Sequence, residues 1–150
     1  QAHIVGNSMG GYGACKAALL RPERYAAAGL FSGVLAMAVM NAVPNDPRRA
    51  EFELLFGDLS QLGGGVHDPL AWLQQAAQAG SDLPRLHLAC GRQDDLYPLS
   101  LMFRSACESL GVAVDYHEED ARHDWFFWEA QLRRFLEQEL GPLPGHQEAD

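Results

Sequence analysis

A serine between two glycines, in Gly6-Asn7-Ser8-Met9-Gly10, is the first group of residues in this sequence that could perform a reaction. The pattern G-x-S-x-G places a serine hydroxyl on a sharp turn between a strand and a helix, exposed for attack on a carbonyl carbon. We expect both Gly6 and Gly10 to be needed for that turn, because side chains there would clash. The backbone N–H of Met9 would then face the carbonyl oxygen and stabilise the oxyanion. The pattern alone is weak, because Ser8 could equally cap the helix that follows.

A serine nucleophile needs a base and a carboxylate that orients the base. Asp94 and Asp95 directly follow the apolar segment 85–90, and His123 lies a few residues after the segment 112–117. The order serine, acid, histidine is that of the α/β-hydrolases, in which each residue lies beyond the carboxyl end of a strand. We therefore interpret the serine, Asp94 and His123 as a catalytic triad, with Asp95 as the competing acid.

The other histidines are weaker candidates for the base. They lie in or at the end of predicted strands, in a loop or near the chain end: His3, His87, His117, His67 and His146. The segment 117–124, HEEDARHD, could instead hold a metal ion, although a solvated acidic loop is the simpler interpretation. The three cysteines are widely spaced with no CxxC pair, so we expect no structural metal, and the proposed chemistry needs no cofactor.

The elements that must position these residues alternate between strands and helices. Apolar runs predict strands at 2–6, 26–32, 85–91 and 112–117. Helices are expected at 9–20, around 48–56, from Asp68-Pro69 to about 79, and around 99–110. A last helix is expected to bury one face made of Trp125, Trp128, Leu132, Phe135, Leu136 and Leu140. This alternation predicts an α/β fold, with a parallel sheet covered by helices on both faces.

The composition sets limits on partners and on organisation. The formal net charge is -9, from 20 acidic and 11 basic residues, which argues against nucleic-acid binding. No apolar run approaches the roughly 18 residues of a membrane span. No targeting signal is visible, which favours the cytoplasm but leaves the compartment open. We expect one domain over 1–140 and a mobile polar tail over 141–150.

Five ordered motifs resemble the esterase D-like family of α/β-hydrolases, and in particular its bacterial tributyrin-esterase branch. They are GNSMGGYGA, FSG, FGDL, CGRQDDLY and HDWFFW, and they run from residue 6 to residue 128. The resemblance implies that Ser8 is the nucleophile, His123 the base and, through the pattern C-G-x-x-D-x-L-Y, Asp94 the acid. Ala121 and Arg122 depart from the family, which tends to place glycines before the histidine.

Family members are nearly twice as long, so the resemblance implies that this chain is a C-terminal portion. The missing part would supply half of the sheet and the second oxyanion donor, and the strand at 2–6 would expose an edge prone to self-association. The expected function is hydrolysis of short-chain acyl esters, small-molecule substrates, through an acyl-enzyme on Ser8. The alternatives are acyl transfer to an alcohol or sugar by the same triad, and a non-catalytic remnant that binds acyl compounds or a partner.

Overall fold

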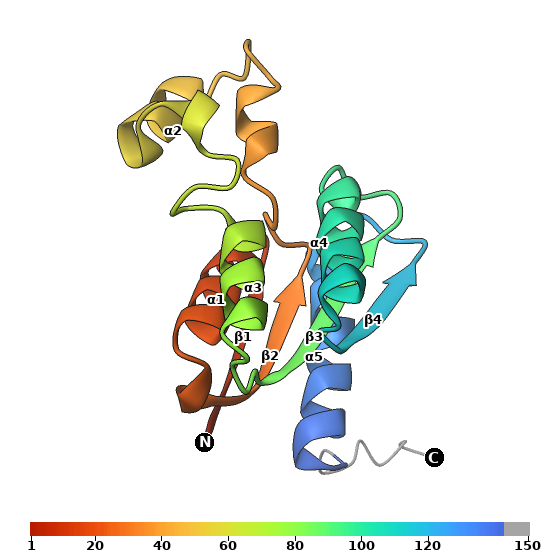
Figure 1. Cartoon of the computed structure of the whole chain (residues 1–150). Coiled ribbons are helices and arrows are strands. Elements are labelled where there is room, and N and C mark those ends of the chain that lie inside the picture. Colours follow the sequence, from red (N-terminus) through yellow and green to blue (C-terminus); the bar gives the residue numbers. More distant parts are fainter. Residues whose placement is uncertain (143–150) are drawn as a thin grey trace.

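Four apolar segments form one parallel sheet in the computed structural model, which describes residues 1–142 (Figure 1). The strands lie in the order of the chain: β1 (Ala2–Asn7), β2 (Tyr25–Phe31), β3 (Arg85–Gly91) and β4 (Val114–Glu119). Every pairing is parallel, so the carboxyl ends of the strands meet at one edge of the sheet. Within the described residues β1 pairs only with β2, which leaves its other edge unpaired.

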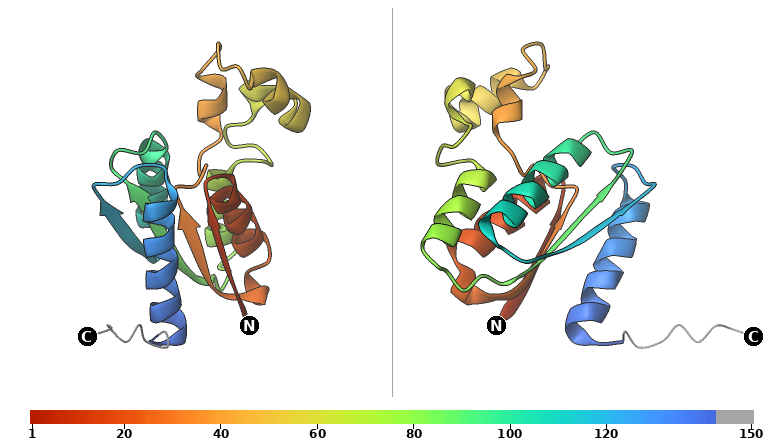
Figure 2. Two further views of the ribbon diagram at one scale, coloured as in Figure 1. Left: turned by 180° about the vertical axis from the view of Figure 1, so that it is seen from behind. Right: turned by 45° about the vertical axis from the view of Figure 1, so that its right-hand side comes forward.

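Helices cover both faces of the sheet, as the alternation of elements predicts. Three of them lie on one face: α1 (Met9–Leu20), α3 (Pro69–Gln78) and α4 (Tyr97–Leu110). On the other face, α5 (Trp125–Leu140) is the one helix among the described residues, and it lies against β2 and β3 (Figure 2). Short 3₁₀ turns occupy Pro22–Arg24, Ala38–Asn41 and Leu59–Gln61. The expected α/β fold, a parallel sheet with helices on both faces, is therefore confirmed.

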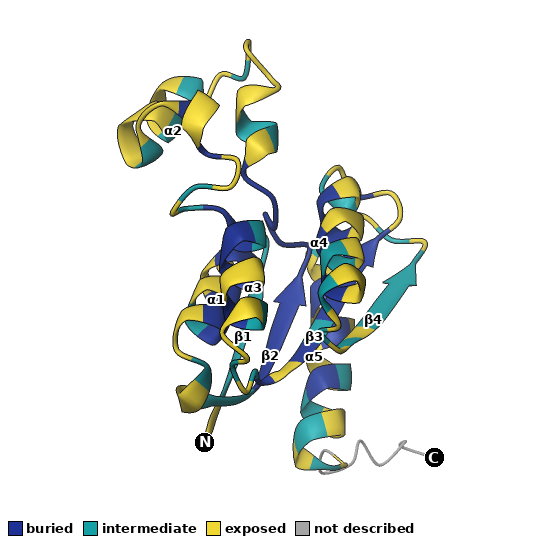
Figure 3. Ribbon diagram, in the orientation of Figure 1, coloured by how far each residue is buried: buried dark blue, intermediate teal, exposed yellow. Residues whose placement is uncertain are grey.

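Alternate residues of the central strands fill two hydrophobic cores. Ala28 and Leu30 of β2 pack with the helices α1, α3 and α4, whereas Ala27 and Phe31 pack with α5. The same alternation holds in β3, and both central strands are almost entirely buried (Figure 3). Burial on both faces explains why these strands read as continuous apolar runs in the sequence.

The strand β4 begins later than the predicted 112–117, because the helix before it ends with a longer turn. Gly111 has a left-handed conformation with φ 69°, and the N–H of Val112 donates to the carbonyl of Cys107. At its other end the strand extends to Glu119, which pairs with Gly91 of β3, so His117 lies inside the strand rather than at its end.

The predicted buried face of α5 is partly wrong. The residues that pack on the sheet are Phe127, Trp128, Gln131 and Phe135, with Leu136 half-buried. Trp125 is 72% exposed, and Leu132 and Leu140 are also exposed. The reason is that α5 contacts β2 and β3, so the side of the helix that faces β1 stays uncovered. Trp125 and Leu132 instead line a groove beside β1.

The segment between β2 and α3 projects beyond the carboxyl edge of the sheet (Figure 1). It contains α2 (Arg49–Phe56), close to the helix expected around 48–56. The buried carboxylate of Asp68 accepts hydrogen bonds from the N–H groups of Met37 and Gly64, at 3.2 and 2.8 Å, and so fixes both ends of the segment. It also caps α3 through the N–H of Leu70.

No helix among the described residues is both long and apolar enough to cross a membrane. Most of the predicted tail at 141–150 lies outside the described residues.

Candidate active site

Ser8 occupies the tight turn between β1 and α1. Its backbone has φ 57° and ψ -123°, a combination that is costly for any residue with a side chain. The Ser8 N–H donates to the carbonyl of Phe31 in β2 at 2.9 Å, which ties the turn to the neighbouring strand. The Ser8 hydroxyl makes no capping hydrogen bond to α1, so the interpretation of Ser8 as a helix cap is wrong.

The glycines around this turn have different roles. A Cβ atom on Gly6 would collide with the carbonyl group of Gly10, as expected for a turn this sharp. The expected clash at Gly10 is absent, because nothing among the described residues lies within 4 Å of a Cβ placed there. Three glycines at the start of the helix, Gly10, Gly11 and Gly13, are poor helix formers that suit a close approach to a strand, and the structure shows that Gly11 makes this approach: its Cβ would lie 2.9 Å from the Cα of Gly33. The helix can approach the end of β2 this closely only with glycine at that position.

The structure brings the side chains of Ser8, His123 and Asp94 together in one chain of hydrogen bonds. His123 Nε2 lies 2.9 Å from Ser8 Oγ, and His123 Nδ1 lies 2.8 Å from Asp94 Oδ2. An ionised carboxylate can only accept, so the proton of a neutral imidazole lies on Nδ1. Nε2 then accepts the hydrogen bond of the serine hydroxyl, which is the arrangement of a serine nucleophile with its base.

Asp94, and not Asp95, faces the histidine. The side chain of Asp94 is completely buried, and its second oxygen, Oδ1, accepts from the N–H of Leu96 at 2.8 Å. Asp95 is exposed on the same turn. Asp94 therefore has both oxygens engaged, one by the backbone N–H of Leu96 and one by the ring of His123.

The turn that carries Asp94 is joined to the loop that carries His123 by backbone hydrogen bonds. Arg92 N–H donates to the carbonyl of Glu119 at 2.8 Å, and Gln93 N–H donates to that of Ala121 at 3.0 Å. Gly91 permits this approach, because a Cβ there would collide with the Ala121 carbonyl. Sequence reasoning missed Gly91, although its place directly after an apolar strand and before the acid was a usable signal.

Burial and hydrogen bonds keep the groups around the acid in definite protonation states. Burial raises the pKa of the Cys90 thiol to about 11, so it remains neutral beside Asp94. Glu118 accepts hydrogen bonds from the hydroxyls of Tyr116 and Tyr97 at 2.6 and 2.7 Å, which lowers the pKa of Glu118. The hydrogen bond that Tyr97 donates to Glu118 raises the pKa of the Tyr97 hydroxyl. Through the hydroxyl of Tyr97, the ionised Glu118 thus links α4 to β4.

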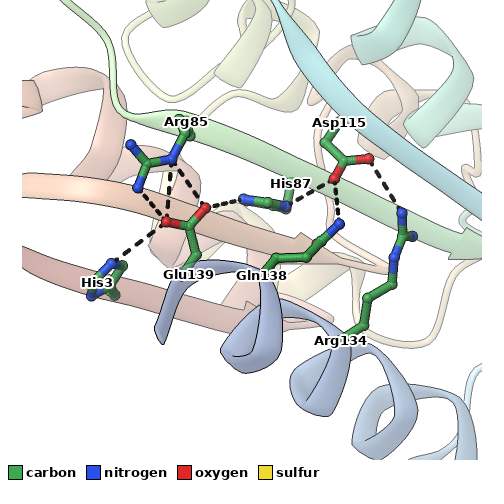
Figure 4. A network of polar contacts seen from close by, with 7 residues as sticks. All are labelled: His3, Arg85, His87, Asp115, Arg134, Gln138 and Glu139. Atoms are coloured by element: carbon green, nitrogen blue, oxygen red, sulfur yellow. Dashed lines mark hydrogen bonds and ion pairs between the residues drawn. The ribbon is translucent and has the colours of Figure 1, made fainter. Parts of the chain in front are cut away.

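The other histidines lie away from Ser8. His87 bridges Glu139 and Asp115 at 2.7 and 3.3 Å, in a network that ties the end of α5 to the sheet (Figure 4). His3 belongs to the same network, His117 contacts Glu119, and His67 packs on Phe56; His146 lies outside the described residues. Within residues 1–142 no group of three or more potential ligands, including the segment 117–124, is arranged to hold a metal ion.

A parallel α/β sheet with a serine, a histidine and an aspartate in contact at its carboxyl edge is typical of serine hydrolases of the α/β-hydrolase class. Comparison with known proteins agrees. The sequence model of the family described as Esterase matches residues 1–139, and the chain belongs to that family. The predicted esterase resemblance is thus confirmed, whereas the particular branch stays a prediction.

Characterised relatives and solved structures are similar over most of this chain. An acetyl esterase of Caldicellulosiruptor saccharolyticus is 30% identical over 139 residues, which cover 89% of this chain and 52% of the relative. The crystal structure of an S-formylglutathione hydrolase from Staphylococcus aureus superposes with a TM-score of 0.78 at 31% identity, covering 91% of this chain and 53% of that one. The fluorophosphonate-binding serine hydrolase F of the same organism gives a TM-score of 0.79 at 31% identity, covering 91% and 52%. This chain therefore spans about half the length of these relatives.

Proposed function

We propose that this chain carries the catalytic groups of a serine esterase that hydrolyses short-chain acyl esters through an acyl-enzyme on Ser8. The observation that supports this proposal is the continuous hydrogen-bond chain from Ser8 Oγ through the His123 ring to Asp94, at 2.9 and 2.8 Å. Each group has the donor or acceptor role that the reaction needs, without rearrangement.

The proposed reaction has two halves. In the first, Ser8 Oγ attacks the ester carbonyl carbon while its proton passes to His123 Nε2, and the N–H of Met9 stabilises the oxyanion. Met9 is the first residue of α1, where N–H groups lack intrahelical acceptors and the helix dipole adds partial positive charge. His123 then gives the proton to the departing alkoxide, and the alcohol leaves. In the second half, a water molecule attacks the carbonyl carbon of the acyl group and gives a proton to His123 Nε2. His123 then returns a proton to Ser8 Oγ as the bond to the acyl group breaks, and the carboxylic acid leaves.

The proposed substrate class rests on the relatives. The C. saccharolyticus relative is named an acetyl esterase and one S. aureus relative an S-formylglutathione hydrolase; both names refer to small acyl groups. We therefore propose that the acyl group is short and that no cofactor takes part.

Labelling with a fluorophosphonate probe tests the nucleophile, because the probe reacts with activated serines. We expect mass spectrometry to locate the probe on Ser8 and Ser8→Ala to remain unlabelled, while Ser60→Ala, a change at an exposed serine, labels normally. Hydrolysis rates should fall from the acetate to the octanoate of p-nitrophenol. An unlabelled wild-type chain would favour the alternative of a non-catalytic remnant. Acyl products formed with added alcohols would favour the acyltransferase.

A further inference from the structure

Ser32 follows β2 directly and has an unusual backbone conformation. Its φ is 46°, a left-handed value that favours glycine, and Ser32 is completely buried. A glycine would adopt this conformation at lower cost, so the serine must supply something that glycine lacks. The hydroxyl is that feature: Ser32 Oγ accepts a hydrogen bond from the indole Nε1 of Trp128 at 3.1 Å.

Trp128 in turn lies against the base. Its ring and the imidazole of His123 are perpendicular, with centroids 4.8 Å apart. Trp128 is nearly buried in the first turns of α5, whereas the His123 side chain is 36% exposed at the end of a loop. The hydrogen bond from His123 Nδ1 to Asp94 fixes one atom of the ring, which could still swing about that bond. A rigid indole on one side of the ring restricts that motion.

The residue that contacts Trp128 directly follows the residue that contacts the backbone of Ser8. The carbonyl of Phe31 holds the Ser8 N–H at 2.9 Å, and the next residue, Ser32, holds Trp128. The end of β2 is itself fixed, because the Ser32 N–H donates to the carbonyl of Ala89 in β3 at 2.8 Å. The backbone at Phe31 and Ser32 thus helps to position the nucleophile directly and the base through Trp128.

From this geometry we infer that Ser32 and Trp128 are positioning residues, which hold the His123 ring at hydrogen-bond distance from Ser8. The inference rests on the proposed function, because it concerns the same serine and histidine. Neither residue touches the reacting atoms, and each acts through another group. The FSG and HDWFFW motifs of the sequence therefore gain a physical role.

Two substitutions, one at each residue, test the inference. Ser32→Gly relieves the strain of the left-handed backbone but removes the acceptor of the Trp128 hydrogen bond. We expect the fold to keep or gain stability. The rate of fluorophosphonate labelling at Ser8 should fall about three- to tenfold, which corresponds to the free energy of one hydrogen bond. Trp128→Phe should cause a similar loss. Trp72→Phe is the matched control, because the buried Trp72 indole also donates one hydrogen bond, to Val66 at 2.9 Å, remote from His123. The double variant should be no slower than the slower single variant.

A second measurement is independent of reactivity. We expect the Nδ1 proton of His123 to give a distinct NMR signal in the wild-type chain, and to broaden in Ser32→Gly and Trp128→Phe but not in Trp72→Phe. If the wild-type chain is not labelled, the proposed function fails, and this signal still decides whether the ring is held. An unchanged signal and labelling rate in Ser32→Gly would overturn the inference, as would equal losses in Trp72→Phe.

Discussion

Replacing Asp94 by asparagine is the sharpest test of the proposed triad, because the structure dictates how the new amide must lie. Asp94 Oδ1 accepts from the Leu96 N–H, so the amide oxygen has to take that position. The amide NH₂ then replaces Oδ2 and points at His123 Nδ1, 2.8 Å away in the wild-type chain. The opposite orientation would place two donors against each other inside a buried site, at a cost of about 1–3 kcal/mol.

This orientation reverses the proton on the histidine. An NH₂ group facing Nδ1 makes that nitrogen an acceptor, so the neutral ring must carry its proton on Nε2. Nε2 then donates toward Ser8 Oγ and cannot take the proton of the hydroxyl. In serine proteases the same change of tautomer lowers kcat by about 10⁴-fold, and we expect a loss of that order here.

The assay is hydrolysis of p-nitrophenyl acetate together with the rate of fluorophosphonate labelling, with circular dichroism to verify folding. Asp95→Asn provides the matched control, since the same change is made one residue away on an exposed side chain. We expect it to stay within about threefold of wild type, as suits a surface change. Activity of Asp94→Asn within tenfold of wild type, or an equal loss in Asp95→Asn, would refute the assignment of the acid.

Four further expectations follow from the structure. Ser8→Ala should lower ester hydrolysis by about 10⁶-fold with an unchanged circular dichroism spectrum; a small loss would contradict the nucleophile. Gly6→Ala should destabilise the fold by about 3 kcal/mol in urea unfolding, whereas Gly10→Ala, with open space around it, should stabilise the helix by about 0.5 kcal/mol. Arg85 and His87 hold the pKa of Glu139 at about 2, below its ordinary 4.5, so its stabilisation is present above pH 4.5 and disappears as the pH falls toward 2. Glu139→Gln should remove about 2 kcal/mol at neutral pH and flatten this dependence. One edge of β1 is unpaired within residues 1–142, and it should make the 150-residue chain self-associate in light scattering; a clean monomer would count against that.

The order of strands and helices could be predicted from the sequence because each element has a strong local signal. The central strands are apolar on both faces, and Asp68-Pro69 is an unambiguous helix start whose side-chain cap is present in the structure. The positions of Ser8, Asp94 and His123 could be predicted for a topological reason: parallel strands bring their carboxyl ends to one edge. Three residues far apart in the chain therefore had to lie close together.

The predictions that were wrong, the buried face of α5 and the clash at Gly10, depend on tertiary contacts that the spacing of residues in the sequence does not reveal. The apolar stripe of α5 was expected to be one buried face, but Trp125 and Leu132 turn toward β1 and line a groove there. Hydrophobic spacing shows which residues share a side of a helix, and the tertiary contacts decide which side meets the sheet. Similarly, the choice between Gly10 and Gly11 depends on the distance to Gly33, a residue of another loop.

The departure at Ala121 and Arg122 has a simple structural explanation. The loop before His123 supports the acid through carbonyl oxygens, since Glu119 and Ala121 accept the N–H groups of Arg92 and Gln93. Any residue type supplies a carbonyl, so glycine is not required on this side of the contact. The steric demand falls on the opposite side, where Gly91 faces the Ala121 carbonyl. An exposed arginine at position 122 can therefore stand where the family tends to have glycine without moving Asp94 or His123. The hydrogen bond between His123 and Ser8 is kept.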